Sequence, residues 1–298
     1  MEMPAAGNRI VDIALWVWFA LTTVSVAYVA YDVVISRPKM KVMRWSWVLA
    51  TLYTGPVGFI VYWLWCREPM SETDEKSGAP LSKQSLESTM HCLAGCVTGV
   101  IVAVVIVSLL RLPMGIETIM EYVASFGLGL FIFQALLAKQ MIGCSYGQAV
   151  KVSCFAQWLS MNPVMAGMIP VMVILMSHDM RGMDLAWLRF WGILSLASLV
   201  GAVLAYPVNW WLVKNRLQPG MGGMKGEGHN HTTSAASKLA VTLVTVVMLA
   251  GGVALAALYG GLSMRAGDQA ATEARDALDA QPPLHARLPL GEAARPPL

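Results

Sequence analysis

The feature that most constrains this chain is a series of long stretches with almost no charge. Each is about 20 or more residues long, the length that a helix needs to cross the hydrocarbon core of a bilayer. Only 13% of the 298 residues are charged, against about 25% in a typical soluble domain. Backbone polar groups in a bilayer must be satisfied within the segment, which favours helices. The sequence therefore predicts an all-α polytopic membrane protein.

We predict seven transmembrane helices from the apolar runs, at residues 10–35, 45–66, 91–110, 116–138, 155–176, 185–213 and 239–262. Residues 139–154 are too polar to span, so we expect a connecting helix or a re-entrant piece buried by protein. The predicted organisation is a two-helix segment (1–66), a polar linker (67–90), a four-helix domain (91–222), a His-containing loop with the last helix (223–262) and a disordered tail (263–298).

Basic residues in the first loop predict the orientation. This loop carries Arg37, Lys39, Lys41 and Arg44, and cytoplasmic loops are enriched in Lys and Arg. We therefore expect a periplasmic N-terminus and, with seven spans, a cytoplasmic tail. All five cysteines, and the loop with Met221 and Met224, then lie at or just below the outer surface.

Several function classes find no support in the sequence. There is no dense basic patch for nucleic acid, and neither a Walker loop nor a GxSxG motif is present. Four acidic residues, Asp12, Asp32, Glu117 and Glu121, are predicted near the ends of spans, which does not favour proton coupling in mid-membrane.

The motif HCLAGC opens the third predicted span. Cys92 and Cys96 lie about 40° apart on a helix, one turn from each other, and two thiolates so placed can hold a soft ion such as Cu(I). His91 points about 100° away from Cys92, and could join them only if the helix end unwinds. Alternatively, Gly95 and Gly99 form a GxxxG in which the cysteines merely pack helices.

A third interpretation of the cysteines is redox chemistry. Cys92 or Cys96 would then pair with Cys144 or Cys154 on a neighbouring helix.

Methionines form a stripe along the fifth predicted span. Spacings of 4, 3, 4 and 4 keep five of them within about 80° of arc, at Met161, Met165, Met168, Met172 and Met176. Thioethers bind Cu(I) and need no deprotonation, so the stripe could carry this ion, with Pro163 and Pro170 opening the helix locally. Alternatively, methionine is flexible core filler. The segment MGGMKGEGHNH adds His229 and His231 as candidate metal ligands in a Gly-rich loop.

From residue 88 to 222 the chain resembles an uncharacterised bacterial membrane family known only as a domain of unknown function, family 4396. The resemblance lies in HC-x-x-GC, here His91 to Cys96, and in P-x-N-x-x-L, here Pro207, Asn209 and Leu212. The segment after the second motif, KNRLQPGM, departs from the family in having no histidine beside its Gly-Met. The resemblance implies a bacterial inner-membrane location, and some members are labelled copper-related.

These observations leave three hypotheses. The first is a membrane protein that binds or transports a soft metal, Cu(I) above others, with copper-handling proteins as partners. Its ligands would be the HCLAGC residues, the methionine stripe and the loop histidines. The second is a non-catalytic scaffold or assembly partner, and the third is a membrane thiol redox protein.

Overall fold

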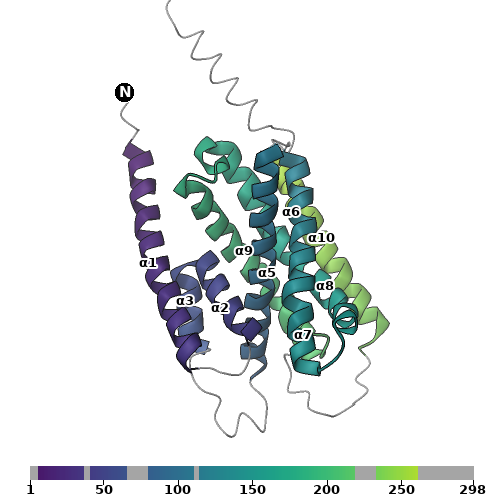
Figure 1. Ribbon diagram of the computed structural model, residues 1–298. Coiled ribbons are helices and arrows are strands. Elements are labelled where there is room, and N and C mark those ends of the chain that lie inside the picture. The colour runs from purple at the N-terminus through teal and green to yellow at the C-terminus, as the bar shows by residue number, and fades with distance from the viewer. Residues whose placement is uncertain (1–5, 37–40, 66–79, 111–113, 219–232, 261–298) are drawn as a thin grey trace, which may run out of the picture.

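A computed structural model describes residues 6–36, 41–65, 80–110, 114–218 and 233–260, and these form helices and no strand. Six helical stretches are long and apolar enough to cross a bilayer: Arg9–Ile35, Leu81–Leu110, Ile116–Ile142, Tyr146–His178, Leu188–Lys214 and Ala235–Gly260. The prediction of an all-α, multi-pass membrane protein is therefore confirmed. Figure 1 shows these helices side by side as a bundle.

The second predicted span, 45–66, is wrong. It is a hairpin of two short helices, α2 (Lys41–Thr54) and α3 (Pro56–Trp65), which contact each other through the rings of Trp47 and Tyr62. The chain reverses at Gly55, whose φ of +63° strains any other residue. At 1.5 Å per residue, helices of 14 and 10 residues are about 21 and 15 Å long. Each is too short to cross a hydrocarbon core of about 30 Å.

Helix α5 (Leu81–Leu110) begins ten residues before the third predicted span. Residues 81–90 therefore belong to a helix and not to the predicted linker. They are polar enough to resemble a linker in sequence, but Ser85, Ser88 and Thr89 are buried by neighbouring helices. His91 consequently lies within a regular helix and not at its frayed end.

The fourth span combines three elements in one continuous run. These are α6 (Met114–Leu128), the π-helix η1 (Gly129–Gln134) and α7 (Ala135–Ile142), which ends at Gly143 in the left-handed conformation. Helix α8 (Tyr146–His178) starts just beyond this glycine. The Ser145 side chain caps it by accepting a hydrogen bond from the backbone N–H of Gln148. The segment 139–154 thus comprises the end of α7, a short turn at residues 143–145 and the start of α8. It is neither a separate connecting helix nor a re-entrant piece.

Helix α8 occupies the centre of the bundle and continues through both of its prolines. It packs against α9 (Leu188–Lys214) and α10 (Ala235–Gly260) at positions without side chains. A Cβ added to Gly167 would lie 2.8 Å from the Gly201 nitrogen, and one added to Gly252 would lie 2.5 Å from the Ala166 oxygen. Such small residues permit close helix approach in membranes.

Helix α1 (Ala6–Ser36) runs in the same direction as α9, while α5, α8 and α10 run the opposite way (Figure 1). The hairpin returns the chain to the end at which it began. As a result, the start of α1 and the end of α10 lie at the same end of the bundle. The expectation that the two chain ends lie on opposite sides came from counting the hairpin as a full span.

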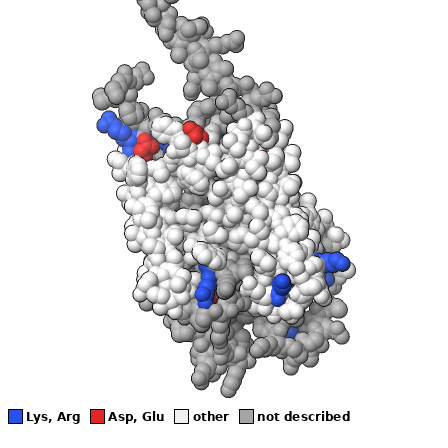
Figure 2. Space-filling model, in the orientation of Figure 1, with Lys and Arg blue, Asp and Glu red and all other residues white. Residues whose placement is uncertain are grey.

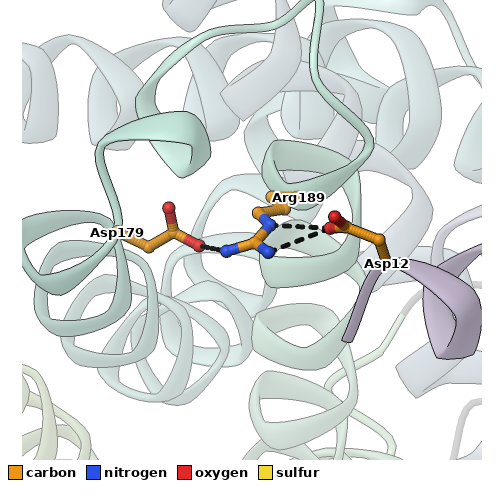
Figure 3. Close-up of polar contacts among 3 residues, drawn as sticks. All are labelled: Asp12, Asp179 and Arg189. Carbon is orange, nitrogen blue, oxygen red and sulfur yellow. Dashed lines mark hydrogen bonds and ion pairs between the residues drawn. The ribbon is translucent and has the colours of Figure 1, made fainter. Parts of the chain in front are cut away.

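The Arg189 guanidinium connects α1 to the start of α9 (Figure 3). Two of its nitrogens lie 3.0 Å from Asp12 Oδ1, and the third contacts Asp179, the C-cap residue of α8. Trp18 Nε1, further along α1, donates to Ser195 Oγ at 3.2 Å. These contacts hold the N-terminal helix against the rest of the bundle.

Charged side chains are distributed unequally between the two ends of the bundle (Figure 2). The end where α1 finishes carries mainly basic residues, at helix termini and in the first turns: Arg44, Lys83, Lys139, Lys151, Lys214, Arg216 and Lys238. The opposite end carries the Arg189 cluster together with Arg9, Asp184 and Glu117, and is the more acidic of the two. Below, these are called the basic end and the acidic end.

The ion cluster yields a stability prediction. Arg189→Met removes its contacts to Asp12 and Asp179 and should lower the free energy of unfolding by about 1–3 kcal/mol. Thermal unfolding of the purified protein in detergent measures this loss. Arg9→Met, at an exposed position of α1 near the same end, is the matched control and should unfold like wild type. Equal stability of the two variants would contradict this role.

The hairpin yields a topology prediction. Single cysteines at Trp45, Trp65 and Ser82, all exposed, should react with a membrane-impermeant maleimide from one and the same side. The background for this test carries serine at every native cysteine. A cysteine at Trp187, which is exposed at the start of α9, should react from the other side. Labelling of the Trp45 and Trp65 positions from opposite sides would contradict the hairpin and support a single span over residues 45–66.

Candidate functional site

Cys92 and Cys96 lie one turn apart on α5, and both side chains are completely or almost completely buried. Their Sγ atoms are 3.7 Å apart. Cys96 lies 15 residues after the start of α5, which places it about 22 Å along the helix at 1.5 Å per residue. The two thiols, hereafter the dithiol, thus lie about midway along α5 and not at its end.

His91 does not join the dithiol. Its Nδ1 lies 2.7 Å from the Ser46 hydroxyl of α2, and its ring stands edge-on to Phe133 of η1 with centroids 5.8 Å apart. The regular helix points His91 away from the cysteines, as the 100° rotation per residue requires. Within the described part of the chain, no group of three or more His, Cys, Asp or Glu residues could hold a metal ion.

The methionine stripe lies inside the protein. All five predicted residues, Met161, Met165, Met168, Met172 and Met176, are buried and belong to the same contiguous core cluster as Cys92 and Cys96. Met161 lies 15 residues after the start of α8, so it is at about the same depth as Cys96. From there the stripe runs toward the acidic end, where Met176 lies near Gly182.

A buried polar network links three helices beside the dithiol. Asn209 Oδ1 on α9 accepts hydrogen bonds from Ser88 of α5 at 3.0 Å and from Ser160 of α8 at 2.8 Å. The Ser160 side chain also approaches the Cys92 thiol. The Asn209 side chain of the P-x-N-x-x-L motif therefore joins the helices around the dithiol. No pattern in the sequence distinguishes Ser88 or Ser160 from the other serines of the membrane helices.

Gly95 and Gly99 pack α5 against the fourth span. A Cβ on Gly99 would lie 2.4 Å from the Ser125 Cα, and one on Gly95 would lie 2.9 Å from the Gly129 Cα. Ser125 Oγ additionally donates to the Cys96 carbonyl at 2.9 Å. The GxxxG is therefore used inside the chain, against α6 and η1, and it does not bring the methionine helix to the cysteines.

Two buried glutamines near this contact were not identified from the sequence, and the burial of one glutamate was not expected. Gln157 on α8 and Gln134 on η1 are fully buried, and none of their amide atoms has a hydrogen-bond partner among the described residues. Glu121 on α6 was placed near a span end, but it is only 5% exposed. Unmatched buried polar groups are rare, and polar residues in membrane spans often serve function.

The remaining candidate ligands do not meet the dithiol. Cys144 packs in a separate cluster at the turn before α8, and Cys154 is exposed, so neither is paired with Cys92 or Cys96 as the redox hypothesis requires. His229, His231, Met221, Met224 and Cys66 lie outside the described residues. The helix ends that flank the histidine loop lie at the basic end, away from the Met176 end of the stripe.

The fold and this site define a multi-pass helical membrane protein with a buried dithiol at its centre. Residues 82–218, from α5 to just past α9, match the family model described as a domain of unknown function (DUF4396). The resemblance expected from the sequence is thereby confirmed. No curated protein and no solved structure matches the chain.

The glycine contact can be tested directly. Gly99→Ala forces a methyl group against the Ser125 backbone and should destabilise the protein by about 1–3 kcal/mol, as overpacking of a tight core does. Gly251→Ala on α10 is the control, because nothing lies within 4 Å of the added Cβ. Thermal unfolding compares the two, and a stable Gly99→Ala variant would refute the close packing.

Proposed function

We propose that this protein is a membrane Cu(I)-binding protein in which the dithiol is the binding site. One observation carries the proposal: two buried sulfur atoms lie 3.7 Å apart at the depth where a buried row of thioethers begins. Thiolates and thioethers are the side chains that select Cu(I). Neither the imidazole of His91 nor the glutamates are part of this proposed ligand set.

The chemistry of binding follows from the burial of the site. When Cu(I) binds one cysteine as a thiolate, an S–Cu bond replaces the S–H bond and one proton leaves to solvent. The Cu(I)–thiolate unit carries no net charge, which limits the cost of placing it in an apolar interior. The second cysteine completes the pair of sulfur ligands without a redox step.

The methionine stripe extends this proposal from binding to transport. Thioethers remain neutral, so Met161 through Met176 offer an uncharged row of soft ligands from the dithiol toward the acidic end. An ion that is held by one sulfur at a time can move along such a row. The stripe supplies no oxygen ligand of the kind that Mg²⁺ or Ca²⁺ prefers.

The charge distribution orients the proposed path. The basic end carries most of the described lysines and arginines near helix ends, so we place it on the cytoplasmic side of a bacterial inner membrane. The N-terminus then faces the periplasm, and so does the end of α10. In this orientation the stripe leads to the periplasmic face, where copper-handling proteins would exchange Cu(I) with this protein.

Metal content tests the proposal. Purified full-length protein loaded with Cu(I) and then desalted should retain about one ion per chain, and the double variant Cys92→Ser, Cys96→Ser should retain none. The matched control is Cys144→Ser, Cys154→Ser, which changes the two less buried cysteines and should bind like wild type. Unfolding curves of the metal-free variants verify that each is folded.

Two results would reject the proposal. One is unchanged copper retention in the Cys92→Ser, Cys96→Ser variant. The other is a wild-type protein that retains no Cu(I) while mass-shift trapping shows its two buried cysteines cycling between thiol and disulfide, which would favour the redox hypothesis.

A further inference from the structure

The Gln157 side chain is an unusual polar group in the core of the protein. It lies on α8, three residues before Ser160, and is fully buried. Neither its amide nitrogen nor its amide oxygen has a hydrogen-bond partner among the described residues. A buried amide that stays unpaired is costly, so its retention in the centre of a membrane domain calls for a ligand or a function.

The position of this amide is set by a gap in the opposing helix. A Cβ on Gly129, the first residue of η1, would lie 2.2 Å from Gln157 Nε2 and 3.1 Å from its Cδ. The amide therefore occupies the space that any other residue at 129 would fill. Gly129 in turn contacts Gly95, the neighbour of Cys96, and the Gln157 side chain approaches the Cys96 thiol.

Gly129 is the first residue of the π-helix η1. A π-helix adds one residue to a turn, and such insertions frequently occur at functional sites. In η1 the extra residue lies within the span that packs on both α5 and α8. The result is a notch at Gly129 that receives the Gln157 amide from α8 beside the sulfur atoms of α5.

We infer that Gln157 is a positioning residue for the dithiol: its amide N–H donates to the Cys96 sulfur when this sulfur is a metal-bound thiolate, and the Gly129 notch holds the amide there. The inference rests on the proposed function and extends it beyond the sulfur ligands. A neutral thiol is a weak acceptor, whereas a thiolate is an anion, and hydrogen bonds to ionised acceptors are about twice as strong as neutral ones.

This role has a consequence for the two states of the protein. In the metal-free state the buried amide faces only a neutral thiol, which is a weak acceptor, and this leaves the amide poorly satisfied. In the metal-bound state it gains a charged acceptor. Removing the amide should therefore weaken metal binding without weakening the metal-free fold, a combination that a purely structural residue does not produce.

The test compares three variants of the full-length protein: Gln157→Met, which keeps the length but loses the donor; Gly129→Ala, which fills the notch; and Gly127→Ala. The last is the matched control, because nothing lies within 4 Å of a Cβ at this nearby position of the same span. Cu(I) affinity is measured by competition with a chromophoric Cu(I) chelator. Thermal unfolding of the metal-free protein is measured in parallel.

Gln157→Met should bind Cu(I) about 10–100-fold more weakly than wild type, the usual effect of removing an outer partner of a metal ligand. Its metal-free melting temperature should equal or exceed that of wild type. Gly129→Ala should also lose affinity, and Gly127→Ala should behave as wild type.

The inference is overturned if Gln157→Met binds Cu(I) like wild type, or if its affinity falls only together with its metal-free stability. In both cases wild-type binding stands, so the proposed function survives. Absence of Cu(I) binding by wild type would reject the proposed function and this inference together.

Discussion

Close backbone contact around α8 is the constraint on which the rest of the structure depends. In a bilayer, apolar side chains gain little by leaving lipid, so helices associate through tight packing and buried polar contacts. The glycines at 167, 201 and 252 let α9 and α10 approach α8 from different sides. This approach shields the whole methionine stripe from lipid. A stripe facing outward would have been ordinary apolar surface, and its burial is what makes it a candidate path.

The same packing creates the polar interior. Asn209 reaches two serines on neighbouring helices because all three helices meet closely. Tyr122 likewise donates to Asn162 Oδ1 at 2.8 Å and accepts from Trp158 Nε1 at 3.1 Å, close to the dithiol level. These hydrogen bonds satisfy groups that would be costly in lipid. The Gln157 amide differs from them, because it and the Gln134 amide are buried without a hydrogen-bond partner among the described residues.

The sequence predicted the class of fold well, because six uncharged stretches of spanning length leave little alternative. It failed at the hairpin, where the apolar run 45–66 has the composition of a span. Only the reversal at Gly55 distinguishes a hairpin from a single span, and a lone glycine before a proline is compatible with both structures. The start of α5 was missed for a related reason: polar residues such as Ser85 and Thr89 resemble a linker until neighbouring helices are known to cover them.

For the candidate site, helical periodicity placed Cys92 and Cys96 together and His91 apart, and the structure agrees. The periodicity of the methionines also predicted a single face correctly, although it could not tell whether that face meets lipid or protein. Gln157 and Gly129 could not be found in this way. They are adjacent because η1 packs against α8, and the pairing of two helices far apart in the chain cannot be read from helical periodicity.

The hairpin also changes how the chain is built from its parts. The matched domain comprises four crossings, so it begins and ends on one side of the membrane by itself. Helix α1 and helix α10 each add one crossing, on opposite flanks of this unit. Because the hairpin adds none, the additions are symmetrical, and the start of α1 and the end of α10 lie at the same end of the bundle. A protein module joined directly to the start of α1 and one joined directly to the end of α10 would therefore be neighbours, at the end of the bundle toward which the methionine row points.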